Sequence, residues 1–410
     1  MPTRASASAD ARRLILARGL RGFADGAVSV LLASYLTHLG LTPFQVGAIV
    51  TGTLLGSAAL TIAIGIVGHR LRRRPLLLAA AALMAGTGIG FVALSAFWPL
   101  LVVAVIGTLN PSAGDVSVFL PVEQAALAET SEASRLTATF AWYNLVGTLA
   151  GALGALASGV PEMAASMFAV RTVTAERLGF VVYVVTAIGV AVVYGRLSPR
   201  VEHEGRVASA PLARSRAIVL RLAALFSLDS FGGGFVVQSL LVLWLYRRFD
   251  LSVGTTGMIF FIAGLLAAFS QFLSSLLARR IGRIRTMVYT HLPANVFLML
   301  AGVAPSVELA VTFLLLRMAL SQMDVPARQS YVMAIVPPEE RAAASSFTNV
   351  PRSLATALAP FLAGMMLERS SFGWPLVVGG LLKAVYDVLL LIGFRAVTPP
   401  GEEEVSHQQV

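Results

Sequence analysis

About twelve apolar runs of roughly 20 residues divide the sequence, and they limit its possible folds more than any other feature. Each run is long enough to cross a hydrocarbon core of ~30 Å as an α-helix. The runs use most of the 410 residues, so the segments between them are too short for a separate soluble domain. Charged residues make up only 13% of the chain, against about 25% in an ordinary soluble domain. The sequence therefore predicts an all-α protein embedded in a lipid bilayer.

The twelve spans can be placed from the positions of the apolar runs. We expect them at residues 15–37, 44–68, 75–94, 98–121, 137–160, 178–195, 217–245, 254–278, 284–303, 307–331, 343–366 and 372–394. With the N-terminus inside, the loops and tails on the inner side carry 19 arginines and those on the outer side carry 5. Positive residues gather on the cytoplasmic side of membrane proteins. We therefore expect both termini in the cytoplasm.

Composition argues against several classes of function. Cysteine is absent, and the five histidines do not have the spacing of metal ligands. We therefore expect no cofactor, no metal site and no enzymatic activity. The net charge of +10 is compatible with nucleic-acid binding, but the basic residues lie mostly in loops, where the positive-inside rule explains them. We expect no nucleic-acid partner and a monomer.

An internal repeat relates the two halves of the sequence. The segment after the second span reads Gly65-Ile-Val-Gly-His69-Arg70-Leu-Arg72-Arg73-Arg74, and the segment after the eighth span reads Ser275-Leu-Leu-Ala-Arg279-Arg280-Ile-Gly282-Arg283-Ile284. Their offset is 210 residues. Asp115 matches Asp324 at an offset of 209, and Asn144 matches Asn349 at an offset of 205. Ordered matches at nearly constant spacing are typical of duplicated membrane domains.

The repeat predicts two pseudo-symmetric six-helix bundles. We expect the first at residues 1–195, a polar cytoplasmic linker at 196–216, and the second at 217–410 with a polar C-terminal tail. Many secondary transporters are built from such halves.

The loop after the second span resembles the signature of the major facilitator superfamily, G-x-x-x-D-R-x-G-R-R/K. Gly65, Arg70, Arg73 and Arg74 match it, whereas His69 replaces the Asp and Arg72 the second Gly; the second copy keeps Arg280, Gly282 and Arg283. The resemblance implies the twelve-helix major facilitator fold and transport by alternating access. The run Gly154-Ala155-Leu156-Ala157-Ser158-Gly159 in the fifth span is similar to the G-P-x-x-G-G motif of the drug/proton antiporter branch.

The resemblance also implies a gate at the cytoplasmic side, where loop arginines bind acidic groups in one conformation and release them in the other. The candidate gate residues are Gly65, Arg70, Arg73, Asp115, Arg280, Gly282, Arg283 and Asp324. We expect Arg70 to pair with Asp115 and Arg280 with Asp324, because buried charge pairs are poor stabilisers but effective switches. The alternative is that these arginines only anchor the topology.

Charged residues inside the spans are candidates for function, because each is costly in a bilayer and needs a partner or a wet cavity. The candidate proton and substrate residues are Asp25, Asp229, Arg21, Arg317, Arg352, Lys383 and Asp387. Asp25 and Asp229 lie about 11 residues into their helices, near the midplane. The resemblance implies that helices one and seven line the central cavity, where such a carboxylate can exchange a proton for substrate.

Residue spacing gives alternatives for the remaining charges. Arg21 precedes Asp25 by four residues, and Lys383 precedes Asp387 by four, so each pair shares one face of its helix. For Lys383 and Asp387 we favour a pair that neutralises itself within the last span. We expect His291, a lone histidine of the ninth span, to be a hydrogen-bonded packing residue.

These features support two functional hypotheses. The first is proton-coupled export of small organic or amphipathic compounds across a bacterial plasma (inner) membrane by a multi-pass protein. The alternative is proton-coupled uptake or exchange of an anionic metabolite, because Arg317, Arg352 and Lys383 outnumber the midplane carboxylates. Both partners are small: a substrate molecule and protons.

Overall fold

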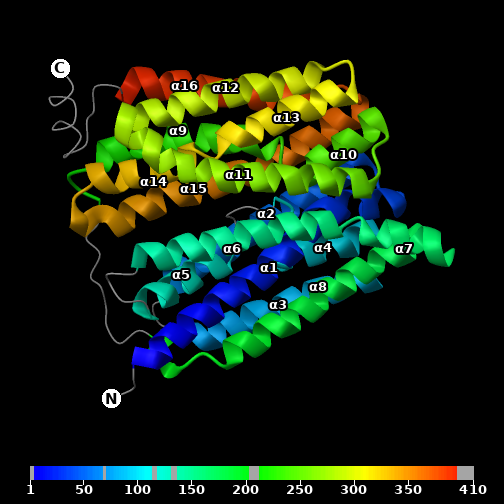
Figure 1. Ribbon diagram of the computed structural model, residues 1–410, viewed down its shortest axis with the longest axis horizontal. Coiled ribbons are helices and arrows are strands. Elements are labelled where there is room, and N and C mark those ends of the chain that lie inside the picture. Colours follow the sequence, from blue (N-terminus) through cyan, green and yellow to red (C-terminus); the bar gives the residue numbers. More distant parts are fainter. Residues whose placement is uncertain (1–3, 68–70, 113–117, 131–135, 203–211, 395–410) are drawn as a thin grey trace. The chain divides into compact units, whose positions relative to one another are not determined.

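The computed structural model describes residues 4–67, 71–112, 118–130, 136–202 and 212–394. Within these ranges the regular structure consists of α-helices and two short 3-10 helices, so the all-α prediction is confirmed (Figure 1). The first half of the sequence forms α1 (Arg4–His38), α2 (Pro43–Val67), α3 (Arg73–Ala93), α4 (Phe97–Ile106), α5 (Phe119–Thr130), α6 (Leu136–Ala157), α7 (Val160–Phe168), α8 (Thr172–Gly195) and η3 (Pro199–Val201). The second half forms α9 (Arg216–Gly234), α10 (Gln238–Phe249), α11 (Val253–Ile281), α12 (Arg283–Val303), α13 (Val307–Ser321), α14 (Asp324–Ile335), η4 (Pro338–Glu340), α15 (Arg341–Arg369) and α16 (Trp374–Phe394).

Ten stretches of the described residues are long and apolar enough to cross a membrane. Three of them join two helices: α6 with α7, α9 with α10, and α13 with α14. Helix α1, which carries Arg21 and Asp25, and helix α4, with 10 residues, are not among the ten. The protein is therefore a multi-pass membrane protein in which several spans are interrupted.

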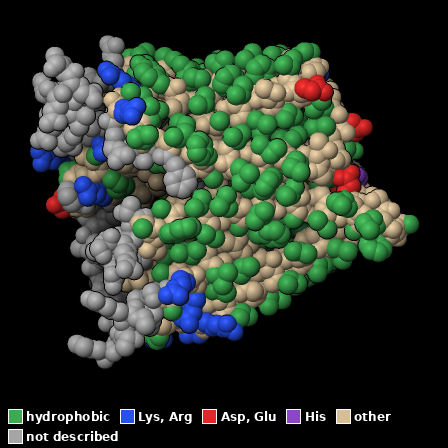
Figure 2. Space-filling view, viewed as in Figure 1, with side chains coloured by type: hydrophobic (Ala, Val, Ile, Leu, Met, Phe, Trp, Pro, Cys, Tyr) green, Lys and Arg blue, Asp and Glu red, His purple; other side chains and the backbone are tan. Residues whose placement is uncertain are grey.

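The helix surfaces suit a lipid environment. In Figure 2 hydrophobic side chains cover most of the visible surface along the helices, whereas charged side chains appear near the helix ends. Large apolar side chains such as Trp98, Phe168, Phe269 and Ile392 are exposed. Exposed apolar area of this extent is typical of a surface that contacts lipid tails.

The described helices form two compact units, whose boundaries differ from the two sequence halves. Unit 1 contains residues 1–206, 237–264 and 360–371, and unit 2 contains residues 207–236, 265–359 and 372–410. Unit 1 thus includes α10, the beginning of α11 and the end of α15 together with the helices of the first half. The two six-helix bundles predicted from the repeat stay a prediction.

Unit 1 is built around α1, which packs along α6 and α8. Gly22 and Gly26 of α1 lie against the backbone at Gly147 and Gly151 of α6, where no side chain fits. Small residues at such crossings let membrane helices approach closely. The glycines of the fifth span therefore serve helix packing, as their spacing indicates.

Unit 2 is built around α12, which packs along α16 and α13, while α9 packs along α16. Its apolar core includes Phe226, Tyr331, Leu390 and Phe394. Two of its spans break near the charged residues. The run Gly232-Gly233-Gly234 ends α9, and α13 ends at Ser321 before α14 begins at Asp324. An acidic residue is favourable in the first turn of a helix because the N-terminus is the positive end of its dipole.

Candidate functional site

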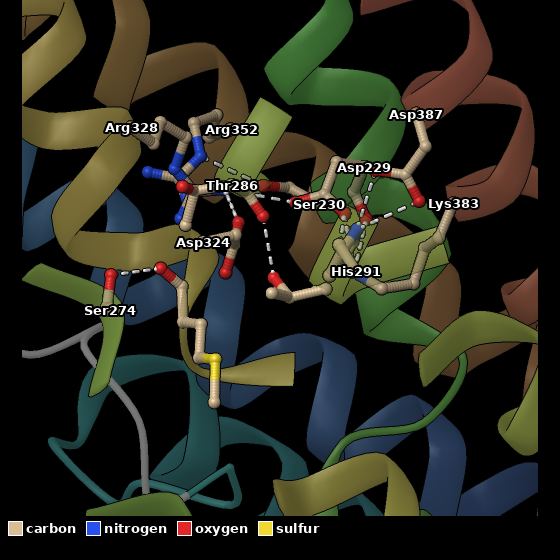
Figure 3. A network of polar contacts seen from close by, with 12 residues as sticks. Asp229, Ser230, Ser274, Thr286, His291, Asp324, Arg328, Arg352, Lys383 and Asp387 are labelled. Atoms are coloured by element: carbon tan, nitrogen blue, oxygen red, sulfur yellow. Dashed lines mark hydrogen bonds and ion pairs between the residues drawn. The ribbon is translucent and has the colours of Figure 1, made fainter. Parts of the chain in front are cut away.

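Asp229 of α9 lies at the centre of a buried cluster of charges in unit 2 (Figure 3). Lys383 Nζ of α16 lies 2.5 Å from Asp229 Oδ1, and Arg328 Nη1 of α14 lies 3.2 Å from Asp229 Oδ2. Each of the three side chains is less than one tenth exposed. Three helices thus meet at one carboxylate, and removing it would leave two buried cations without their counter-ion.

Asp387 of α16 forms the second part of the cluster. His291 Nδ1 lies 2.9 Å from Asp387 Oδ1, and Asn295 donates to Asp387 Oδ2 at 2.8 Å. His291 Nε2 points to the other carboxylate, 3.7 Å from Asp229 Oδ1 (Figure 3). The imidazole therefore links two carboxylates, a role that goes beyond packing. The structure also corrects the expected pairing within the last span: Lys383 and Asp387 share a helix face but bind partners on other helices.

The pairing of Asp324 also differs from the prediction. Asp324 Oδ2 lies 3.2 Å from Arg328 Nη1, one helical turn away, and Arg328 links it to Asp229. Arg280, the expected partner, is exposed. Arg328 lies in the same helix as Asp324, one turn away, whereas Arg280 lies at the end of α11, so the closer arginine binds the carboxylate.

Arg352 of α15 reaches the same region through hydrogen bonds. Its Nε donates to the Ser230 hydroxyl at 3.1 Å, and its Nη1 donates to Asn349 Oδ1 at 3.2 Å. Ser230 follows Asp229 directly, so Arg352 lies beside the central carboxylate of the cluster.

Arg317 of α13 differs from Arg328, Arg352 and Lys383, the basic residues described above. Its Nε is buried without a hydrogen-bond partner, and its Nη1 contacts Met318 Sδ at 3.3 Å. A thioether is a weak acceptor. Among the described residues no carboxylate lies within ion-pair distance of Arg317, although Asp229 is near enough to interact with its charge. The guanidinium therefore keeps much of its capacity to bind an anion.

A second buried cluster lies in unit 1 around Glu123 of α5. Arg21 of α1 forms an ion pair with this carboxylate, and the hydroxyls of Tyr143 and Tyr194 donate to it, the latter at 2.5 Å. The guanidinium of Arg21 also stacks over the Phe119 ring, with its central carbon 4.3 Å from the ring centre. Glu123 is completely buried.

Sequence reasoning missed Glu123 because it ended the fourth span at residue 121. Pro is compatible with the first turn of a helix, where its missing N–H costs nothing. In the structure Pro121 is the third residue of α5, so Glu123 continues inside a helix. The available signal was an acidic residue inside the largely apolar run of residues 118–128.

Asp25 of α1 is 7% exposed and accepts a hydrogen bond from the Asn110 side chain. Arg18 and Arg21 interact with its charge, yet among the described residues no cationic nitrogen lies within ion-pair distance of its carboxylate. Arg21, the expected neighbour at four residues' distance, binds Glu123 instead. Asp25 thus differs from Glu123, Asp229 and Asp387, which all have cationic or histidine partners.

Part of the predicted cytoplasmic gate lies outside the described residues. Arg70 and Asp115 belong to this part, and the surroundings of Gly65 are also not described. Arg73 begins α3, where its backbone N–H donates to Glu202 Oε2 at 2.6 Å and its guanidinium donates to the Val201 carbonyl at 2.9 Å. In the second copy, Gly282 precedes α12 with a φ of 85°, a conformation that favours glycine, and Arg283 begins the helix.

A carboxylate also caps the start of α9. Glu340 accepts backbone N–H bonds from Arg214 at 2.9 Å and from Ser215 at 3.0 Å, together with the Ser215 hydroxyl. The Ser215 hydroxyl and these N–H groups lower the pKa of Glu340 from its usual 4.5 to about 2. The described residues contain no group of three His, Asp or Glu side chains that could hold a metal ion.

Comparison with solved structures identifies the fold. The crystal structure of a D-xylose–proton symporter superposes with a TM-score of 0.76 at 14% sequence identity, over 95% of this chain and 98% of the other. At that identity the likeness concerns the fold alone.

Two sequence relatives are also similar. An uncharacterized membrane protein of Saccharomyces cerevisiae, YJR124C, is 26% identical over 426 aligned residues, covering 95% of each chain. The multidrug efflux protein YfmO of Bacillus subtilis is 31% identical over 146 residues, which cover 35% of this chain and 37% of YfmO. The sequence profile of the Major Facilitator Superfamily matches residues 14–321 and 223–409, and the chain therefore belongs to this transporter family.

Proposed function

We propose that this protein is a proton-coupled secondary transporter that exports small organic or amphipathic compounds by alternating access. Membership of the family supports transport. The partial similarity to the efflux protein YfmO and the outline of the antiporter motif at residues 154–159 support export. We further propose twelve crossings, by adding α1 and the α4–α5 segment to the ten apolar stretches, and cytoplasmic termini, from the distribution of arginines. The bacterial plasma (inner) membrane, protons as partner and a monomer remain parts of this proposal.

The unpaired carboxylate of Asp25 is the observation that carries proton coupling. A buried carboxylate without a counter-ion is costly when charged, so its protonated form is favoured by burial. It can therefore take up a proton in one conformation and release it when water or a cation reaches it in another. Glu123 and Asp229, in contrast, each have cationic partners: Arg21 for Glu123, and Lys383 and Arg328 for Asp229. Asp25 is accordingly the proton carrier in this proposal.

The Asp229 cluster has a different role in the proposal. Its ion pairs join α9, α14 and α16 around one carboxylate, and breaking one of them leaves a buried charge uncompensated. Such pairs favour two discrete arrangements over intermediate ones. We propose that Asp229, Lys383, Asp387 and Arg328 hold the second half in defined conformations while substrate passes.

Asp25→Asn tests proton coupling, with Asp25→Glu as the variant that restores a titratable group. Asn keeps the shape and the hydrogen bond but cannot exchange a proton. We expect proteoliposomes with Asp25→Asn to lose accumulation of ethidium driven by a pH gradient, while counter-flow of labelled ethidium at equal pH persists. Persistent counter-flow shows that the variant is folded. Gradient-driven accumulation by Asp25→Asn equal to that of the wild type would refute Asp25 as carrier, and accumulation by the wild type that ignores the gradient would refute coupling.

Arg317 favours a second candidate function, transport of an anionic metabolite. Four basic side chains (Arg317, Arg328, Arg352 and Lys383) lie near three carboxylates (Asp229, Asp324 and Asp387) in unit 2, and Arg317 is the one whose buried Nε has no partner. Hydrogen bonds to a charged group contribute about 1.5–3 kcal/mol, so losing one weakens binding about 10- to 100-fold.

Arg317→Ala separates the two candidates. With fluorescein as the anionic probe, we expect the variant to raise KM by that factor if the substrate is anionic, whereas Arg221→Ala, at an exposed position of α9, leaves KM unchanged. Equal fluorescein affinity of wild type and Arg317→Ala would exclude this role of Arg317.

A further inference from the structure

Two glutamates bind the N-termini of helices that belong to the other half of the sequence. The backbone N–H of Phe44, in the first turn of α2, donates to Glu368 Oε2 at 2.8 Å, and Glu368 lies near the end of α15. The backbone N–H of Gly254, in the first turn of α11, donates to Glu162 Oε2 at 3.0 Å, and Glu162 lies in the first turn of α7. All four residues are in unit 1.

The two contacts are equivalent under the internal repeat. Gly254 follows Phe44 by 210 residues, the offset of the two loop motifs after the second and eighth spans. Glu368 follows Glu162 by 206 residues, close to the offset of 205 between Asn144 and Asn349 of the fifth and eleventh spans. One arrangement therefore occurs twice. Glu162, at the end of the fifth span, binds the start of the eighth, and Glu368, at the end of the eleventh span, binds the start of the second.

Close helix packing accompanies each contact at equivalent positions. A Cβ atom on Gly47 of α2 would lie 2.5 Å from the Pro360 carbonyl oxygen and 2.9 Å from Gly364 Cα of α15. A Cβ atom on Gly257, the counterpart of Gly47 at an offset of 210, would lie against the Ala155 carbonyl oxygen of the fifth span and 2.8 Å from the Ser158 hydroxyl. The helices on each side of both contacts thus touch through their backbones.

A third contact joins α1 and α10. The Ser239 hydroxyl, at the start of α10, is 2.8 Å from the Ser29 carbonyl oxygen of α1, and the Ser239 backbone N–H donates to the Pro111 carbonyl at 3.1 Å. Ser29 and Ser239 are also 210 residues apart. Each of the three contacts joins segments of the two sequence halves. Each lies in the part of unit 1 toward the end of α1.

The chemistry of the glutamate contacts explains what they stabilise. The first N–H groups of a helix have no partner inside the helix, and the helix dipole places partial positive charge there. A carboxylate that accepts such an N–H forms a charge-assisted bond, which is stronger than a neutral one. Since each carboxylate comes from the other half of the sequence, the bond exists only while the two segments are together. When they separate, water takes both groups.

We propose that Glu162 and Glu368 are paired gate residues that hold the protein closed at the end of unit 1 where α1 finishes, each by capping a helix of the other half. This inference rests on the alternating access of the proposed function, but not on its coupling ion or substrate. The two glutamates are positioning residues, since they hold helices and touch no substrate. Losing either cap favours the conformation that is open at this end.

A cysteine at Ala33 provides the readout, because the native chain has no cysteine. Ala33 is 1% exposed and lines a small apolar cavity with Leu243 of α10 and Thr256 of α11. Opening of this end exposes residue 33 to water. In nanodiscs, the reaction rate of Ala33→Cys with a charged methanethiosulfonate reagent, relative to the rate in SDS, therefore measures the open fraction without a substrate.

We expect Glu162→Ala and Glu368→Ala each to increase this rate about tenfold, the factor that corresponds to ~1.4 kcal/mol. The double variant should show the product, about 100-fold, because two independent contacts stabilise the same closed state. The Gln variants should show smaller increases, since an amide oxygen still accepts the N–H but carries no charge. Glu308→Ala, at an exposed position in the first turn of α13, is the matched control and should leave the rate unchanged.

An unchanged rate in the folded double variant would overturn the proposal, as would an equal increase with Glu308→Ala. Folding is checked by a monodisperse elution profile. The outcome is independent of the Asp25→Asn experiment. If Asp25→Asn loses proton coupling but the glutamate variants leave the thiol reactivity unchanged, the gate alone is refuted. If the glutamate variants increase the thiol reactivity but Asp25→Asn keeps proton coupling, the coupling mechanism alone is refuted.

Discussion

Replacing Arg21 by Met should destabilise unit 1 strongly, because the change leaves the fully buried Glu123 without its cation. Two tyrosine hydroxyls remain as donors, but neither supplies a positive charge. Breaking a buried ion pair by removing one partner costs about 3–5 kcal/mol. A cost of 1 kcal/mol shifts Tm by roughly 2–4 °C in a domain of 150–250 residues, and by less in a longer chain. We therefore expect Tm to fall by about 5–10 °C.

The double variant Arg21→Met/Glu123→Leu tests the reasoning. Removing both charges eliminates the uncompensated carboxylate, so the double variant should be more stable than Arg21→Met alone, with a coupling of ~2 kcal/mol or more. Thermal unfolding in detergent, followed by fluorescence-detected size exclusion at one fixed heating time, measures the differences. Arg12→Met, at an exposed position of the same helix, is the control. If the loss of stability of the double variant equals the sum of the losses of Arg21→Met and Glu123→Leu, the pair does not hold the helices together.

Two other predictions concern single residues of unit 2. Gly282 has a φ of 85° and a ψ of 159°, a conformation that is essentially restricted to glycine, so Gly282→Ala should cost about 1–3 kcal/mol and lower Tm. Gly393→Ala, with open space around it, should not lower Tm, and thermal unfolding of both variants checks this. Glu340→Gln should lower Tm at neutral pH, because the charged carboxylate caps α9; the pKa of Glu340 falls from 4.5 to about 2 on folding, so its stabilisation is present above pH 4.5 and is lost toward pH 2. The Tm difference between wild type and Glu340→Gln should therefore shrink across that range, and a constant difference would contradict the role of the charge.

The sequence predicted an all-α membrane protein and several of its buried charges, because both depend on local composition. Apolar length decides whether a segment can cross a bilayer, and a charge inside such a segment is conspicuous. The position of a residue along its helix likewise follows from counting. Asp25, Asp229 and Asp387 are buried in the structure for this reason.

The partners of these charges could not be predicted, because pairing depends on how each helix is rotated against its neighbours. Spacing along one chain reveals only contacts at i and i+4, and it gave Lys383 with Asp387 and Arg21 with Asp25. In the structure Lys383 binds Asp229 across α9 and α16, and Arg21 binds Glu123 across α1 and α5. Asp324 and Arg328, which are also four residues apart, do bind each other, within a single helix.

A carboxylate binds a helix N-terminus at four places, but its origin differs among them. Glu202 caps α3 and Glu340 caps α9, and in each case the cap and the helix belong to the same half of the sequence. Glu368 caps α2 and Glu162 caps α11, and there the cap and the helix belong to different halves. In the proposed alternating access, movement of one half against the other would keep the first two bonds and break the last two. Under this proposal the same interaction stabilises the individual halves through Glu202 and Glu340 and opposes their separation through Glu162 and Glu368.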